Sequence, residues 1–264
     1  MLIDSHCHID APEFDADRDD VIARSLALAV RAFVLPSVAR ENFETVMQIA
    51  ARHPQVVYAL GIHPLYTDRA QESDLQALRL AIEQKLSDRQ LIAIGEIGLD
   101  FFVPGLDRDR QLYFYEQQLQ IAHEFELPVI LHVRRAQDQI LKYLRRARLS
   151  GGIAHAFNGS QQQAEAFLKL NFVLGFGGAM TFSRALQIRR LATTLPPEAH
   201  VLETDAPDIS PSWLHPVRNT PSEIPRIAAV LAELRAIDVD QCATVTATNL
   251  KRVLPRLEAA LRFN

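Results

Sequence analysis

The amino-acid sequence predicts an α/β protein: a TIM-type (β/α)8 barrel, in regular or distorted form, with extra C-terminal helices. Three observations lead to this prediction. Eight short, nearly continuous apolar segments are spread over 264 residues, longer amphipathic segments separate them, and no linker or composition shift divides the chain. Parallel strands that are buried on both faces have this continuous apolar character. Because such barrels usually comprise about 250 residues, we expect a single domain over residues 1–264.

The expected strands alternate with expected helices along the whole barrel. The strands cover residues 2–5, 31–35, 56–61, 91–95, 128–131, 152–154, 172–175 and 200–203. Strands and helices in alternation form a parallel sheet with right-handed crossover connections. An open, doubly wound sheet would satisfy the same alternation and is the alternative architecture.

The spacing of apolar residues predicts where the helices lie. The first helix is expected after an N-cap at Asp15 or Asp17, with Val21, Ile22 and Leu26 on its buried face. After Asp107, apolar residues recur at three- and four-residue spacing, at Leu112, Tyr115, Leu119, Ala122 and Phe125. A third apolar face recurs in the same way, at Ile140, Leu144 and Ala147. From residue 221 onward the sequence is mostly helical, and we expect this part to pack on the barrel exterior.

Composition limits the class of function. The formal net charge is -4 at pH 7, so the whole molecule is not a polycation that binds nucleic acid non-specifically. There are only two cysteines, Cys7 and Cys242, which argues against a disulfide framework and fits a reducing compartment. We expect no secretory signal, no membrane-spanning segment and no obligate protein partner, and therefore a cytoplasmic protein.

Side chains that can bind metal cluster where the expected strands end. Six of the eight apolar segments finish in, or next to, an imidazole or a carboxylate, and five of the nine histidines lie there. These side chains belong to His6, His8, His63, Glu96, His132, His155 and Asp205. The C-terminal ends of all strands in such a barrel meet at one mouth, where active sites are built. We therefore expect these side chains to converge.

The chemistry of this set predicts a metal centre. His6 and His8 are two residues apart on a strand, so both point to the same side and can bind one ion. Imidazole and carboxylate ligands suit Zn²⁺, Mn²⁺, Fe²⁺ or, less well, Mg²⁺, and so many ligands favour two ions. Singly, each has an ordinary explanation: a core histidine for His132, a salt bridge for Glu96, a helix cap for Asp205. Their shared position at strand ends favours the metal centre.

The ordered motifs resemble the TatD-type deoxyribonuclease family of the amidohydrolase-like metal hydrolases. The motifs occupy residues 4–8, 61–64, 95–100, 132–134, 155–159 and 203–207, and the resemblance extends from residue 2 to about residue 255. Residues 134–136 and 203–208 are most similar to the branch usually called YjjV. The resemblance implies one or two divalent ions and metal-dependent 3′→5′ exonuclease activity on DNA. Some relatives are linked instead to removal of D-amino acids from tRNA.

The resemblance also implies roles for single residues. By its motifs, one ion (Zn, Mg or Mn) takes His6, His8 and Asp205, and the other takes His132 and His155, with Glu96 shared. Because Glu96 can bridge the ions, no carbamylated lysine is needed. His63 resembles a substrate or phosphate contact. The chain departs from the family pattern at residues 218–223, in a loop that borders the mouth, so the departure bears on substrate choice.

The predicted reaction is hydrolysis by a metal-activated water. Asp205 has two carboxylate oxygens, so it can hold a metal and also accept a proton from water, and with Glu96 it forms the expected catalytic pair. Arg134 follows His132 by two residues and is expected to pair with phosphate, a solvated arginine being the ordinary alternative. Two other functions stay open: an ester or amide hydrolase such as a D-aminoacyl-tRNA deacylase, and a non-catalytic scaffold stabilised by metal.

Overall fold

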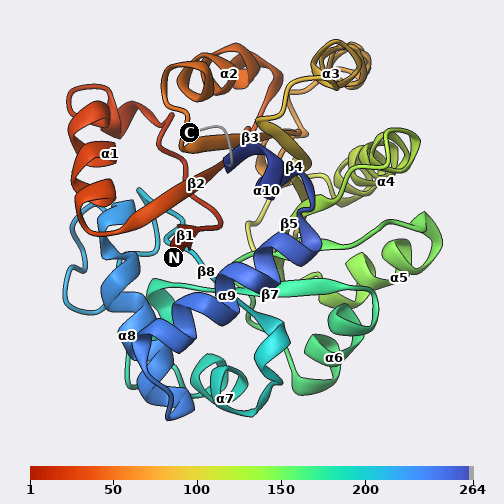
Figure 1. Ribbon diagram of the computed structural model, residues 1–264. Helices are drawn as coiled ribbons and strands as arrows, with labels where there is room; N and C mark the ends of the chain where they lie inside the picture. Colours follow the sequence, from red (N-terminus) through yellow and green to blue (C-terminus); the bar gives the residue numbers. More distant parts are fainter. Residues whose placement is uncertain (262–264) are drawn as a thin grey trace.

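Eight parallel strands form one sheet in which every strand pairs with the next along the chain. The computed structural model describes residues 1–261, so residues 262–264 of the predicted domain lie outside the described residues. The backbone N–H of Ser5 donates to the carbonyl of Leu202 at 2.9 Å, which brings the last strand back to the first. The strands are β1 Leu2–Asp4, β2 Val30–Pro36, β3 Val56–Leu60, β4 Leu91–Asp100, β5 Val129–Arg134, β6 Gly152–Ala154, β7 Phe172–Phe176 and β8 His200–Leu202. The predicted barrel is confirmed, and it is nearly closed (Figure 1).

Helices surround this barrel; those between the strands connect them, and the last ones follow β8 (Figure 1). They are α1 Arg18–Ala27, α2 Phe43–Arg52, α3 Glu72–Lys85, α4 Arg108–Glu124, α5 Gln137–Ala147, α6 Gln161–Lys169, α7 Leu186–Thr194, α8 Ile224–Arg235, α9 Val239–Val253 and α10 Arg256–Leu261. The helices predicted after Asp17 and after Asp107 begin at those positions. Among residues 1–261, no helix combines the length and apolar character needed to cross a bilayer.

The two aspartates that precede these helices behave differently. The Asp107 carboxylate accepts hydrogen bonds from the N–H groups of Asp109 and Arg110 at 2.9 and 3.0 Å, so it caps α4 as expected. Asp17 stands in the N-cap position of α1 but makes no cap hydrogen bond. Its carboxylate instead accepts two hydrogen bonds from the Arg218 guanidinium, at 2.7 and 3.0 Å, and so ties the β8–α8 connection to α1.

Strand β4 extends five residues beyond the predicted end at Gly95. Its register against β5 shifts between Ile94 and Ile97, which is a local irregularity in the parallel ladder. Glu96 lies inside this irregularity, and its N–H donates to the carbonyl of Ser37 in the connection after β2 at 2.9 Å. The bulged strand therefore carries Glu96 into the barrel, where the predicted strand would already have ended.

The C-terminal helices close one end of the barrel. Ile3, Val57 and Ile130, on inward-facing strand positions, belong to the same apolar cluster as Leu250 and Leu257 of α9 and α10. The Asn249 amide donates to the carbonyls of Pro197 and His200, at the start of β8, at 2.8 and 2.9 Å. The expectation of an exterior position is wrong for α9 and α10, which cover the floor formed by the strand N-termini. Figure 1 shows both helices lying across the barrel. The opposite end stays available for a site.

Candidate metal centre at the barrel mouth

A single carboxylate, that of Glu96, lies at the centre of the predicted site. Only 1% of its side chain is exposed. One oxygen, Oε2, lies 3.2 Å from His6 Nε2 and 3.4 Å from His8 Nε2. The other, Oε1, lies 2.8 Å from His155 Nε2 and 3.0 Å from His132 Nδ1. The two oxygens of one side chain therefore face two separate groups of imidazoles.

The residues after β1 and β8 complete the Oε2 side of this cluster. His6 and His8 point to the same side as predicted, with their Nε2 atoms 3.2 Å apart. Asp205 Oδ1 lies 3.6 Å from His6 Nε2 and 3.7 Å from His8 Nε2. The N–H of Asp205 donates to the carbonyl of His6 at 2.9 Å, so the two strand ends are joined next to their side chains.

His63 joins the Oε1 side of the cluster. Its Nε2 lies 3.0 Å from His132 Nδ1 and 3.4 Å from Glu96 Oε1, while its Nδ1 accepts from the N–H of Leu65 at 3.1 Å. Burial lowers the pKa of His63 to about 4, although Glu96 beside it acts in the opposite direction. His63 is thus neutral and lies as deep as the expected ligands. Its predicted substrate role stays a prediction.

Asp100 holds the far side of the His132 ring. Its Oδ2 lies 3.1 Å from His132 Nε2, and its Oδ1 accepts from the N–H groups of Phe102 and Val103 at 2.8 and 3.0 Å. Burial alone would raise the pKa of Asp100, but the hydrogen bonds from His132 and from these two amides lower it to about 2. No role was predicted for Asp100 from the sequence. Its even spacing from Glu96 is a signal only once β4 is known to extend past Gly95.

Glu203 stands behind His155 in a comparable position. Its Oε1 accepts from the N–H of Ala156 at 2.5 Å and lies 3.9 Å from His155 Nδ1. His155 Nδ1 and Glu203 Oε2 are both buried without a hydrogen-bond partner among the described residues. A Cβ at Gly175 of β7 would overlap the Glu203 carboxylate, so only glycine leaves room for it. Glu203 was likewise not predicted, since it follows β8 while His155 follows β6, and only the fold brings the two side chains together.

The electrostatics of the cluster favour a bound cation. Burial alone would raise the pKa of Glu96, but His155, His63 and His6 hold it well below its usual range. Burial disfavours the protonated forms of His8 and His155, yet Glu96 raises their pKa values to about 9 and about 10. The cluster therefore holds a fixed negative charge and attracts positive charge toward it.

The donor set also fits a divalent metal ion. Three groups of side chains each bring one nitrogen or oxygen atom per residue to within 4.8 Å of the others in the group. The groups are His6 with His8 and Glu96, His6 with His155 and Asp205, and His63 with Glu96 and His132. Imidazole with carboxylate is the ligand chemistry of Zn²⁺ and Mn²⁺. The Nε2 atoms of His6 and His8 converge at 3.2 Å, a separation at which a shared cation would satisfy both lone pairs.

Arg134 lies at the rim of the centre. Its side chain is 49% exposed, and its Nη1 lies 3.9 Å from Asp100 Oδ2. The guanidinium group stacks on the ring of Phe102, 3.9 Å from the centroid, and Arg135 lies over the same ring at 4.6 Å. Arg134 is therefore held beside the cluster by a carboxylate and an aromatic ring, while half of it stays open to solvent.

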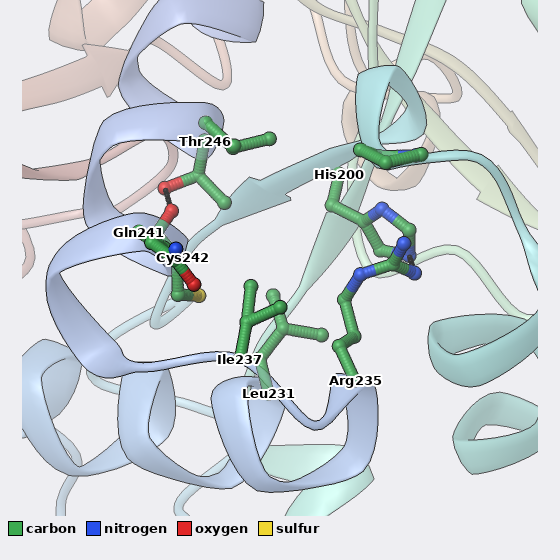
Figure 2. A pocket seen from close by; sticks show the side chains of 9 residues that line it. His200, Leu231, Arg235, Ile237, Gln241, Cys242 and Thr246 are labelled. Carbon is green, nitrogen blue, oxygen red and sulfur yellow. Dashed lines mark hydrogen bonds between the residues drawn. The ribbon is translucent and has the colours of Figure 1, made fainter.

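A cavity of about 310 Å³ lies at the other end of β8 and takes no part in this centre. Figure 2 shows His200 and Arg235 on one side of it, and Cys242 and Thr246 on the other. The Arg235 Nη1 lies 3.3 Å from His200 Nε2 and also donates to the carbonyl of Ala192 at 2.8 Å. Because His200 begins β8 and Glu203 follows its end, this cavity belongs to the barrel floor.

Comparison with known proteins identifies close relatives over nearly the whole chain. The family described as TatD related DNase matches residues 3–255. The chain is 36% identical over 249 residues to the metal-dependent hydrolase YjjV of Escherichia coli K12, covering 94% of this chain and 95% of that protein. It is 32% identical over 255 residues to the metal-dependent hydrolase YabD of Bacillus subtilis strain 168, covering 96% and 98%. The crystal structure of Escherichia coli YjjV, a TatD homologue, matches with a TM-score of 0.92 at 35% identity, covering 96% of this chain and 98% of that one.

Proposed function

Because the chain belongs to the TatD-related DNase family and is a metal-dependent hydrolase, we propose that it removes nucleotides from DNA ends in the 3′→5′ direction. One observation carries the proposal. The two oxygens of Glu96 face separate imidazole groups, as a carboxylate shared by two metal ions would. Two ions held by one bridging carboxylate are typical of enzymes that hydrolyse phosphodiester bonds.

The proposed ligands follow the division made by Glu96. One divalent ion (Zn, Mg or Mn) would be held by His6, His8 and Asp205, the other would be held by His132 and His155, and Glu96 would be shared between them. The chemistry that such ions supply when bound is Lewis-acid polarisation of a phosphoryl oxygen and a lowered pKa of water. We propose that the enzyme acts as one domain in the cytoplasm, where its two buried, unpaired cysteines would stay reduced.

The remaining steps belong to side chains of the protein. Burial raises the pKa of Asp205, against the opposite effect of His155 and His8, so its carboxylate is a better proton acceptor than an exposed one. Glu96 stays ionised and keeps its charge fixed between the two imidazole groups. Arg134 binds a phosphate of the substrate with its exposed guanidinium group, and His63 contacts the substrate from its buried position beside Glu96.

The arginines around the mouth favour a polyanionic substrate over a small ester or amide. Four arginines near the C-terminal ends of the strands each lie over an aromatic ring. The pairs are Arg69 with Tyr66, Arg108 with Phe101, Arg134 with Phe102 and Arg184 with Phe182. A polyanionic chain such as DNA gains from several cations along its path, whereas a small ester or amide does not need them.

The proposal is tested with purified protein supplied with Zn²⁺, Mn²⁺ or Mg²⁺ and a panel of substrates. Single-stranded DNA labelled at its 5′ end should shorten from the 3′ end one nucleotide at a time, and a 3′ blocking group should prevent this. His8→Ala should abolish the activity, whereas His123→Ala, which removes an exposed histidine on α4, should not. Hydrolysis of aminoacyl-tRNA or simple esters alone, with intact DNA, would identify an ester hydrolase instead.

A further inference from the structure

A groove lies beside the metal centre, between the connections that follow β7 and β8. Its volume is about 710 Å³. Phe182 and Arg184 line it from the β7–α7 connection, and Pro207, His215 and Arg218 line it from the β8–α8 connection. Pro207 follows Asp205 by two residues, so the groove begins next to the candidate metal ligand. The groove was not predicted from the sequence.

The two walls of this groove are fixed against each other. The N–H of Ser212 donates to Thr181 Oγ1 at 2.8 Å, across the two connections. A Cβ at Gly178 would overlap the carbonyl oxygen of Ile209, so the backbones pack in direct contact there. Asp17 holds Arg218 with two hydrogen bonds, at 2.7 and 3.0 Å. The groove is therefore part of the folded structure and does not depend on a ligand for its shape.

The walls combine aromatic rings with a cation. The rings of Phe182 and His215 meet edge to face across the groove, with centroids 5.8 Å apart. Arg184 lies over Phe182, 5.5 Å from the ring centroid, and Val217 leaves 61% of its side chain exposed at the rim. Grooves that bind single-stranded nucleic acid use this combination, because bases stack on rings while cations follow the phosphates.

The charges along the groove select Arg184 as its main phosphate contact. Asp208 also lines the groove and would repel a phosphate near it. The charge of Arg218 is balanced by Asp17. Arg184 is exposed and forms no ion pair with any residue in the described part of the chain, so its charge is available to a ligand.

We infer that this groove binds the single strand that leads to the scissile bond, with a base against Phe182 and His215 and a phosphate on Arg184. The inference rests on the proposed function, because a 3′ end held at the metal centre requires a path for the rest of the strand. It makes Phe182 and Arg184 specificity-determining residues for polymeric substrates. They contribute little to the binding of a substrate too short to reach the groove.

Binding measured separately from cleavage tests the inference. We would titrate metal-loaded full-length protein into a fluorescent eight-nucleotide strand with phosphorothioate linkages and follow the anisotropy. Phe182→Ala and Arg184→Gln should each weaken binding about tenfold, in the range known for loss of one stacked base. Arg184→Gln should also reduce the slope of log K against log salt by about 0.7, as expected for one lost phosphate contact. The matched control is Arg190→Gln, an exposed arginine on α7 outside the groove, which should change neither quantity.

The outcomes separate this inference from the proposed function. If DNA is degraded but both variants bind the strand as tightly and with the same salt slope as the control, the groove is not the strand path. The same conclusion follows if the native sequence does not bind the strand at all. If DNA is never degraded while binding still depends on Phe182 and Arg184, the groove stands and the proposed exonuclease activity fails. In a length series, the KM should fall as the strand reaches the groove, and Arg184→Gln should remove that dependence.

Discussion

Asp100→Asn tests whether a carboxylate next to the cluster determines which imidazole nitrogen faces the metal. His132 Nδ1 lies 3.0 Å from Glu96 Oε1, and its Nε2 lies 3.1 Å from Asp100 Oδ2. Burial opposes ionisation of Asp100, but its hydrogen bonds lower its pKa to about 2, so at neutral pH it accepts and cannot donate. When an ion is bound at Nδ1, the one ring proton of His132 must therefore be on Nε2, where the Asp100 carboxylate accepts it.

Asparagine at this position would reverse that arrangement at small structural cost. Its oxygen can still accept from the N–H groups of Phe102 and Val103, which fixes the amide nitrogen opposite His132 Nε2. An amide N–H at that place is a donor, so it favours the tautomer that carries its proton on Nδ1. Loss of an outer partner of a metal-binding histidine typically costs 10–100-fold in affinity, about 1.4–2.7 kcal/mol. We expect the upper end of that range, because the favoured tautomer would carry a proton on the nitrogen that should bind the ion.

Calorimetric titration with Zn²⁺ or Co²⁺ measures the effect. The Asp100→Asn protein should bind one metal equivalent nearly as the native sequence does and lose affinity for the other. Asp109→Asn, on the exposed side of the first turn of α4, is the matched control and should bind both equivalents normally. Asp100→Ala adds the loss of both loop hydrogen bonds and should also lower the melting temperature. Two unchanged binding steps in Asp100→Asn would refute the reasoning about His132.

Three further predictions concern turnover, metal and pH. Asp205→Asn should lower kcat by about 10²–10⁴-fold with the circular dichroism spectrum unchanged, because the amide cannot accept the proton that we assign to Asp205. Removal of metal by a chelator should lower the melting temperature by roughly 5–10 °C per ion, since an ion at a hundred times its Kd adds about 2.7 kcal/mol. Burial and the nearby Arg235 lower the pKa of His200 to about 4, so the folded state resists its protonation. Stability should then fall as the pH drops from 6.5 to 4, by roughly 3 kcal/mol from this residue, and His200→Gln should lose that part of the pH dependence in urea titrations.

Each of these three predictions has an outcome that would contradict it. An Asp205→Asn protein that retains native turnover would remove Asp205 from the proton transfer. Melting temperatures that do not respond to chelator, or to metal added back, would contradict the metal centre itself. For His200, the comparison between native sequence and variant cancels the titration of the other histidines. Equal slopes of stability against pH in the two proteins would show that His200 titrates normally.

The sequence predicted the barrel and its mouth because both depend on local patterns. Continuous apolar runs mark strands that are buried on both faces, and the residue after each run lies at the mouth whatever the detailed packing. That is why His6, His132, His155 and Asp205 could be named before any tertiary contact was known. Where the fold departed from expectation, the cause was packing between elements that lie far apart in the sequence. The apolar faces of α9 and α10 indicate burial but not their partner, and the partner is the barrel floor.

The outer carboxylates were harder to predict for the same reason. Asp100 contacts His132 because β4 continues past its bulge and places Gly98 opposite His132 and Asp100 opposite Arg134 in the next strand. Gly98 has a φ of 142°, and a Cβ there would overlap the His132 backbone, so glycine is required for the strands to approach. No apolar periodicity reports this register. The groove beside the centre is made by two irregular connections, which carry no periodic pattern at all.

The buried carboxylates differ in whether an imidazole lies within hydrogen-bond distance, and this difference explains how the centre can be both charged and stable. Burial raises the pKa of Glu203 to about 8 and that of Asp4 to about 7, although each accepts hydrogen bonds, so these two groups are partly protonated at neutral pH. Glu96 and Asp100 are held ionised by imidazoles that touch them. Negative charge is therefore concentrated on the carboxylates that contact imidazoles and reduced on those where nothing would compensate its desolvation. A scaffold that holds no metal would gain nothing from concentrating charge in this way, whereas a hydrolase that must hold divalent ions next to its substrate would.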